Sequence, residues 1–363
     1  MIPVRLLSVA TALPAHVVDQ DEAADRAAAA FGGKVFRAPD VVQLFANTGI
    51  RTRRLVRPLE WYATPTSFED RNAVYVEAAE ALWIEAATKA LSAAGVAPWD
   101  VGQVVTVSST GIATPSLEAR AGPAIGLSPT AKRTPVFGLG CAGGVGGLSL
   151  AARLAAAEPD KPVLFVTVEL CSLSCRPDEM TKANVVATAL FGDGAAAAVL
   201  QGGSGAKVPG PQRSIEAASE YLWPHTLDIM GWRIDPAGLG VVLDANLPRF
   251  VGERFHEAAE AFLGESGLAR DDIARFVCHP GGARVLPAIE ASLGLGEGAL
   301  DIERAVLADY GNMSAPTVLF VLERVLAQGK AGPSDTGRLV LAALGPGFTA
   351  SFLSLSPPEG PLA

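Results

Sequence analysis

Thiols and imidazoles are scarce in this chain, which has four cysteines and four histidines among 363 residues. The thiols belong to Cys141, Cys171, Cys175 and Cys278. The histidines are His16, His225, His256 and His279. A disulfide scaffold needs a denser set of cysteines, and the chain contains no CxxC pair of the kind found in zinc sites. We therefore expect no disulfide framework and no metal, and each thiol is either a core residue or a nucleophile.

Long apolar runs and an excess of basic charge are also missing. No apolar run reaches about 18 residues free of charge, so the sequence predicts no membrane span. The first residues, MIPVRLLSVATALPAH, lack the basic start and long apolar core of a secretory signal. With 29 basic and 38 acidic residues the net charge is −9, which disfavours nucleic acid as the main partner. We expect a cytoplasmic protein.

Apolar residues are abundant, at 49%, and can form a large core in a chain long enough for two domains or one duplicated domain. In the first half, apolar runs of strand length alternate with helical patterns. We predict strands at 101–109, 162–170 and 194–200, and helices at 72–94 and 143–157.

The second half repeats this alternation of strands and helices after a connection rich in glycine and proline at 202–213. We predict helices at 247–264 and 314–327, and strands at 275–278, 338–344 and 349–355. Strand–helix alternation in both halves predicts an α/β sheet architecture with an internal duplication. The two halves are expected to span residues 1–201 and 214–363.

Cys141 is the first candidate for chemistry. It stands in FGLGCAGGVGGLSL, where an apolar segment ends in glycine and a glycine-started helix follows. This pattern predicts a sharp strand-to-helix turn with the thiol beside a helix N-terminus. The helix dipole there favours thiolate, and backbone N–H groups can stabilise an oxyanion. The alternative is a buried structural cysteine, which is common for free thiols.

His279 and Asn312 are the other candidates. His279, in RFVCHPGG, ends a short apolar strand, and ligands bind at the carboxyl ends of such strands. Asn312, in YGNMSAP, lies in a loop before a helix. The alternatives are a histidine bonded to a loop carbonyl and an asparagine that caps a helix or turn.

A Cys, a His and an Asn together fit one chemistry. The thiolate, held in an ion pair with the imidazole, attacks a thioester. Imidazole and carboxamide N–H groups then stabilise an enolate formed by decarboxylation. Papain-like hydrolases use the same residue types, so the types alone do not choose the reaction.

Five segments carry a family resemblance: GCAGGVGGL, ALFGDGAAAAVL, CHPGGARVL, YGNMSAPTVLFVLE and LGPGFTASFLSL. In this order, they resemble the type III polyketide synthases, the chalcone synthase-like family of the thiolase-like superfamily. The resemblance covers the chain from Val101 onward and is weaker before it. It implies a thiolase-like α/β fold with a duplicated αβαβα layered architecture, in a homodimeric acyltransferase.

The resemblance also implies roles for single residues. Cys141 would carry the starter and the growing chain, while His279 and Asn312 would support malonyl-CoA decarboxylation and the oxyanion. Phe191 matches a gatekeeper aromatic between the CoA tunnel and the cavity, and core packing is its alternative. A loop that shapes the cavity wall corresponds to Gly345, Pro346 and Gly347. Acyl-CoA and malonyl-CoA are implied as substrates, without a cofactor.

Further positions bear on the product. Plant members usually carry threonines where this chain has Ser109, Cys171 and Ser174, and a glycine where it has Trp232. Trp232 would shrink the pocket, yet its MGW segment is similar to bacterial members that take fatty-acyl starters. For Cys171 and Trp232 the alternative is core packing. Thr114 replaces a residue, usually Met, that reaches across the dimer.

The basic residues expected to contact CoA phosphates lie at other positions than in the family. The family's basic clamp should lie near residues 40–47, where this chain has no Lys or Arg. A cluster follows instead: Arg51, Arg53, Arg54 and Arg57. Arginine suits phosphate through bidentate hydrogen bonds, so we expect Arg51, Arg53 and Arg54 to bind CoA. The alternative is a solvated basic loop.

The leading hypothesis is a synthase that loads a fatty acyl-CoA on Cys141, extends it with malonyl-CoA and cyclises it to an alkylpyrone or alkylresorcinol. A 1,3,6,8-tetrahydroxynaphthalene synthase or a chalcone synthase-like enzyme is the second reading. A 3-oxoacyl-ACP synthase III, a cysteine hydrolase and a non-catalytic structural partner subunit are further alternatives. Starter length, number of extensions and ring closure depend on cavity volume and are not fixed by the sequence.

Overall fold

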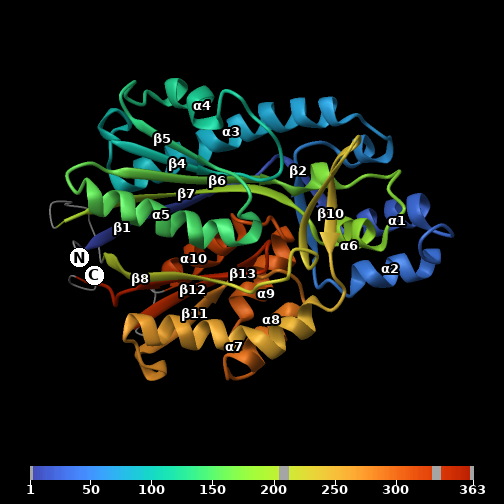
Figure 1. Cartoon of the computed structure of the whole chain (residues 1–363). Coiled ribbons are helices and arrows are strands. Elements are labelled where there is room, and N and C mark those ends of the chain that lie inside the picture. Colours follow the sequence, from blue (N-terminus) through green and yellow to red (C-terminus); the bar gives the residue numbers. More distant parts are fainter. Residues whose placement is uncertain (1–2, 204–211, 329–336, 360–363) are drawn as a thin grey trace.

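In the computed structural model, which describes residues 3–203, 212–328 and 337–359, helices and sheet alternate in layers (Figure 1). The described strands form a nine-stranded mixed sheet in the order β11-β12-β13-β8-β1-β7-β6-β4-β5. Short antiparallel pairing of β1 with β8, such as Leu6 with Arg213, joins its two blocks. Two smaller two-stranded sheets, β2–β3 and β9–β10, lie beside it.

The first block comes from the N-terminal half. Its strands are β1 (Val4–Ala12), β4 (Gln103–Val107), β5 (Lys132–Val136), β6 (Val163–Leu170) and β7 (Asp193–Gly202). β4 is parallel to β5 and β6, whereas β7 is antiparallel to β6 and β1. Every residue of β4 and β6 is buried, which explains their continuous apolar sequences.

The second block repeats this arrangement. Its strands are β8 (Arg213–Leu222), β11 (Ile273–Cys278), β12 (Arg338–Gly345) and β13 (Thr349–Leu355). β11 is parallel to β12, and β13 is antiparallel to β12 and β8. β11, β12, β13 and β8 thus match β4, β6, β7 and β1 in order and direction. Within the described residues no strand takes the place of β5, so β11 is an edge strand.

Helices cover both blocks and separate them (Figure 1). The outer faces carry α3 (Phe68–Ala94), α4 (Leu117–Ile125), α7 (Leu247–Ser266) and α8 (Val285–Ser292). Between the blocks lie α5 (Gly143–Ala157) and α10 (Thr317–Gln328), preceded by α9 (Asp301–Tyr310). Separate buried apolar clusters fill the middle layer and the layers beneath α3 and α7. This order of layers confirms the duplicated αβαβα thiolase-like fold.

The remaining elements gather at the end of the molecule away from the two chain ends (Figure 1). They are β2 (His16–Asp19), α1 (Gln20–Phe31), α2 (Ala38–Ala46), β3 (Thr52–Leu55), α6 (Lys182–Leu190), β9 (Met230–Asp235) and β10 (Gly238–Leu243). Among them, β2, α1, α2, β3 and α6 share a buried cluster that includes Phe31, Val41 and Phe45.

The strands and helices predicted from apolar patterns are present, with boundaries that shift by a few residues. The helix predicted at 143–157 coincides with α5, and the one predicted at 72–94 begins earlier, at Phe68, after the N-cap Ser67. Most of the connection predicted at 202–213 lies outside the described residues. The limits 1–201 and 214–363 for the two halves stay predictions.

One segment of the described chain, Gly140–Ala157, has the length and apolar composition to cross a membrane. It consists of the turn at Cys141 and α5, and 61% of it is buried inside the fold. Its burial between the two sheet blocks is that of a core helix.

Candidate active site

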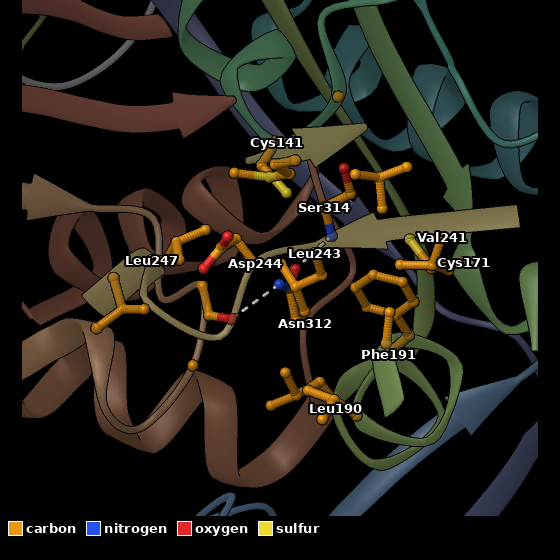
Figure 2. Close-up of a pocket in the computed structure, with 18 of the residues that line it drawn as sticks. Cys141, Cys171, Leu190, Phe191, Val241, Leu243, Asp244, Leu247, Asn312 and Ser314 are labelled. Atoms are coloured by element: carbon orange, nitrogen blue, oxygen red, sulfur yellow. Dashed lines mark hydrogen bonds between the residues drawn. The ribbon is translucent and has the colours of Figure 1, made fainter. Parts of the chain in front are cut away.

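A cavity of about 370 Å³ lies where α2, α6 and the β9–β10 hairpin meet the two sheet blocks. Cys141, His279 and Asn312 all line this cavity, although they come from three separate parts of the chain. Figure 2 shows Cys141 and Asn312 projecting into the same space, with Ser314 beside them. The tertiary fold therefore brings together the three residues that the sequence singled out.

Cys141 lies in the sharp turn that its glycine-rich sequence predicts. β5 ends at Val136, a short 3-10 turn covers Gly140–Ala142, and α5 begins at Gly143. Gly140 has a positive φ of 49°, and a Cβ there would approach Pro346 Cδ at 2.6 Å. Only glycine fits this close approach, which holds the turn against the loop after β12.

His279 directly follows edge strand β11 and is 4% exposed. Its backbone N–H donates to Ala342 O of β12 at 2.8 Å. Both ring nitrogens are buried without a hydrogen-bond partner among the described residues. Burial lowers the pKa of His279 to about 4, so the imidazole is neutral at pH 7.

Asn312 follows α9 and is oriented by two hydrogen bonds. Its Oδ1 accepts from the Ser314 N–H at 2.7 Å, and its Nδ2 donates to Gly281 O at 3.1 Å. Its backbone forms a bridge with Phe191, through Asn312 N to Leu190 O (2.9 Å) and Gly192 N to Asn312 O (3.0 Å). The second Nδ2 hydrogen is the donor left for the Cys141 sulfur or for a ligand bound beside it.

The ionisation of Cys141 differs from expectation. Burial raises the pKa of its thiol to about 11, while hydrogen bonds from Ser314 and Asn312 act in the opposite direction. We expected the helix N-terminus and an ion pair with His279 to favour thiolate. In the unliganded cavity desolvation outweighs those effects, and the resting pair is a thiol and a neutral imidazole.

The predicted pocket residues separate into two groups. Ser109, Cys171, Phe191, Trp232 and Pro346 line the cavity. Trp232 Nε1 donates to Ser109 O at 2.7 Å, so this side chain ties β9 to the segment after β4.

Three other predicted pocket residues do not line the cavity. Ser174 is turned away, with its hydroxyl donating to Cys171 O at 2.7 Å. Gly345 faces the turn of Cys141 instead, since a Cβ there would lie 2.6 Å from Ala142 Cβ. Gly347 completes the β12–β13 turn with a positive φ of 75°. A backbone hydrogen bond at Ser174 and the turn geometry at Gly345 and Gly347 account for these positions in the structure, and their roles toward a substrate stay predictions.

The prediction that Arg53 binds CoA is wrong. Arg53 is 3% exposed, and its guanidinium donates to Thr188 O (2.7 Å), Ala189 O (2.7 Å) and Phe191 O (2.9 Å). It thus serves the carbonyl groups at the end of α6, which helical hydrogen bonds leave free.

The rest of the arginine cluster also lies away from the cavity. Arg51 forms an ion pair with Asp309, and Arg57 pairs with Glu77 at 2.7 Å. Arg54 belongs to β3. None of these side chains lines the cavity that contains Cys141.

The capping role of Arg53 predicts a large loss of stability. Arg53→Gln should lower the free energy of unfolding by at least about 3 kcal/mol, because each buried carbonyl left unpaired costs about 1–3 kcal/mol. Urea unfolding followed by circular dichroism measures the change. Arg51→Gln removes an exposed charge nearby and should cost less than about 1 kcal/mol. If Arg53→Gln instead unfolds like the wild-type protein but binds acyl-CoA more weakly, the hypothesis that Arg53 binds CoA would be supported again.

Several lining residues were not singled out from the sequence. Ser314, with a positive φ of 58°, reaches the Cys141 sulfur, and its place two residues after Asn312 was the available signal. Val241, Leu243 and Asp244 of the β9–β10 hairpin also line the cavity. Nothing in their local sequence marks them, because only the folded hairpin brings them to the wall.

Two family models match most of the chain. Residues 3–205 match the N-terminal domain of chalcone and stilbene synthases, and residues 214–356 match the C-terminal domain.

Individual relatives agree with these models. A 1,3,6,8-tetrahydroxynaphthalene synthase of Streptomyces peucetius subsp. caesius is 42% identical over 313 residues, covering 86% of this chain and 82% of the relative. An α-pyrone synthesis polyketide synthase-like protein of Mycobacterium tuberculosis is 31% identical over 352 residues, covering 94% and 88%. The crystal structure of the 1,3,6,8-tetrahydroxynaphthalene synthase of Streptomyces coelicolor A3(2) superposes with a TM-score of 0.89 at 31% identity, covering 98% of this chain and all of that one.

The class of protein follows from the duplicated layers and these matches: the chain has the thiolase-like fold of acyl-transferring enzymes. Within that class it belongs to the chalcone and stilbene synthase family, as its motifs predicted. It is a type III polyketide synthase, an acyltransferase.

Proposed function

We propose that the enzyme loads an acyl-CoA starter on Cys141, extends it by decarboxylative Claisen condensation with malonyl-CoA, and releases a cyclised product. The observation that supports this is the convergence of a thiol, an imidazole with two unpartnered nitrogens and an oriented carboxamide in one cavity.

In the loading step, His279 acts as the base. The resting thiol needs to lose its proton as sulfur attacks the thioester carbonyl, and the neutral imidazole can accept it. The carbon–sulfur bond to CoA then breaks, and the CoA thiolate takes a proton as it leaves. Ser314 and Asn312 stabilise negative charge on Cys141 Sγ during the attack.

In the extension step, His279 and Asn312 act as hydrogen-bond donors. An imidazole N–H and the second Nδ2 hydrogen of Asn312, which faces Cys141, bind the thioester oxygen of malonyl-CoA. Loss of CO2 leaves an enolate on that oxygen, and its carbon attacks the acyl group on Cys141. The bond between the acyl carbon and Cys141 Sγ then breaks, the sulfur leaves as a thiolate, and the extended chain is carried as the CoA thioester. Because Ser314 and Gly281 already orient the carboxamide, its donor needs no rearrangement when charge develops.

A fatty-acyl starter is the first candidate for the substrate. The cavity wall is mostly apolar, through Leu44, Val186, Leu190, Phe191, Met230, Trp232, Val241, Val242, Leu243, Leu247, Val285 and Leu344. Such a wall binds an alkyl chain through burial of apolar surface. The similarity to an α-pyrone synthesis polyketide synthase-like protein supports an alkylpyrone or alkylresorcinol as product.

Synthesis of 1,3,6,8-tetrahydroxynaphthalene from malonyl-CoA alone is the second candidate. A relative with that name is 42% identical to this chain, and Trp232 reduces the space for a long alkyl chain.

Product masses discriminate between these candidates. The purified enzyme is incubated with malonyl-CoA alone and with acyl-CoA starters of increasing chain length. Products that retain the starter's alkyl chain support the first candidate, and an aromatic product from malonyl-CoA alone supports the second. A single added acetate unit, or free acid released without malonyl-CoA, would overturn the proposal.

We also propose a homodimer, as the family resemblance implies. Ile112 and Phe137 follow neighbouring strands β4 and β5 and are 53% and 58% exposed, which provides an apolar surface beside Thr114. A monomer in sedimentation velocity would contradict this arrangement.

Lys182 and Arg284 are proposed as the contacts to CoA phosphates. Both line the cavity and are exposed, which places them at its mouth. Neither forms an ion pair with another residue in the described part of the chain. Unpaired cations at the mouth of a cavity attract an anionic thioester and hold its phosphates.

Loss of both charges should weaken CoA binding. The double variant Lys182→Ala/Arg284→Ala is expected to raise KM for malonyl-CoA about tenfold, with kcat changed less than about threefold. The effect should shrink as ionic strength rises. Arg51→Ala/Arg54→Ala removes the same net charge away from the cavity and should leave KM unchanged. An equal rise of KM in this control would instead favour CoA binding by the arginine cluster predicted from the sequence.

A further inference from the structure

The imidazole of His279 depends on its backbone for its position. Neither ring nitrogen has a hydrogen-bond partner among the described residues, so no side chain fixes the ring. The neighbouring backbone is bonded instead: His279 N donates to Ala342 O, and Gly281 N donates to His279 O at 3.0 Å. The end of β11 therefore determines where the imidazole lies.

The end of β11 has backbone N–H groups on one side that no neighbouring strand in the described chain satisfies. β11 is an edge strand, and alternate N–H groups of a strand point to opposite sides. Because His279 N faces β12, the N–H of Cys278 faces away from the sheet, where β4 in the first block has β5 as a neighbour. No described strand pairs with that side of β11.

Glu303 of α9 occupies this position. Its Oε1 accepts from the Cys278 N–H at 3.1 Å, and its Oε2 pairs with Arg275 Nη2 at 3.0 Å. The side chain is fully buried. A carboxyl oxygen thus satisfies the backbone group that a neighbouring strand would otherwise satisfy.

The same helix leads to the second member of the site. α9 ends at Tyr310, two residues before Asn312. Asn312 Nδ2 in turn donates to Gly281 O, in the loop that follows His279. Glu303 and Asn312 therefore attach α9 and its following loop to both sides of His279.

We propose that Glu303 is a positioning residue, which holds His279 in register with Asn312 by accepting the outward N–H of Cys278. This inference rests on the proposed function, in which malonyl-CoA decarboxylation needs the imidazole N–H and the Asn312 donor at one oxygen atom. The hydrogen bond, and not the charge, is the feature that matters. Glutamine keeps an acceptor oxygen at this distance, whereas aspartate keeps the charge but is one methylene too short.

Two variants separate these contributions. Glu303→Asp is expected to lower kcat for malonyl-CoA decarboxylation about tenfold, because a small shift of the imidazole misplaces its N–H. Its rate of Cys141 acylation by acyl-CoA should fall less than the decarboxylation rate, because in that step His279 accepts one proton and shares no ligand atom with Asn312. Glu303→Gln should stay within about threefold of wild type in both assays. Decarboxylation is followed as acetyl-CoA formation, and acylation by intact mass.

Glu290 provides the matched control. It is also a buried carboxylate that accepts a backbone N–H, from Leu300 at 3.0 Å, and pairs with an arginine, Arg304. Glu290→Asp should lower the melting temperature as Glu303→Asp does, with decarboxylation unchanged.

Two results would overturn the inference: equal decarboxylation in Glu303→Asp and Glu290→Asp, or a greater loss in Glu303→Gln than in Glu303→Asp. Wild-type enzyme that neither acylates nor decarboxylates would instead refute the proposed function.

Discussion

Cys141→Ala is expected to lower the rate of covalent acylation by acyl-CoA at least about 1,000-fold, because the variant lacks the attacking sulfur. Intact mass spectrometry after mixing with acyl-CoA detects the adduct in the wild-type protein and its loss in the variant. The rest of the cavity is preserved, since Cys141 lies in a turn fixed by Gly140 and Pro346.

Cys171 supplies the control for this experiment, because its side chain lines the same cavity. It is 1% exposed, and burial raises its pKa well above the ordinary range, which keeps it a thiol. Cys171→Ala should therefore retain the acyl adduct. An adduct that survives in Cys141→Ala and disappears in Cys171→Ala would transfer the role of nucleophile to Cys171.

His279→Ala and Asn312→Ala should each lower the rate of malonyl-CoA decarboxylation about 100- to 1,000-fold, because each removes a donor to the enolate oxygen. Acylation of Cys141 should persist at a reduced rate in both variants, because His279→Ala lacks the base and Asn312→Ala lacks one hydrogen bond to the sulfur. Release of CO2 measures the first step, and adduct formation measures the second.

His256 on α7 serves as a control, because its side chain is exposed and outside the cavity. His256→Ala should change neither rate. Undiminished CO2 release in His279→Ala or Asn312→Ala would contradict the proposed role of that residue in malonyl-CoA decarboxylation.

The parts of the site that the sequence predicted share a local cause. The turn at Cys141 follows from glycines at 138, 140, 143 and 144, two of which, at 138 and 140, adopt positive φ. The position of His279 follows from the apolar strand before it and the Pro-Gly-Gly after it. In both cases neighbouring residues in the chain decide the backbone, so the pattern is visible without the fold.

The parts that the sequence missed depend on long-range contacts. Arg53 was a plausible phosphate ligand by its type and its basic neighbours. In the structure, β3 packs beside the end of α6, and the guanidinium meets carbonyl groups some 135 residues away. Side-chain direction at such positions is set by whichever segment packs against them.

The amino-acid sequence by itself determined the alternation of the main strands and helices, the internal duplication, the family and the three residues that meet in the cavity, because these follow from apolar periodicity, glycine-dependent turns and motif order. Only the tertiary structure decided which charges are buried, which side chains form the cavity wall, and how an edge strand is satisfied by Glu303. Burial and hydrogen-bond partners arise between segments separated along the chain, by 25 residues for Glu303 and Cys278 and by 135 for Arg53 and Thr188, and no local pattern specifies them.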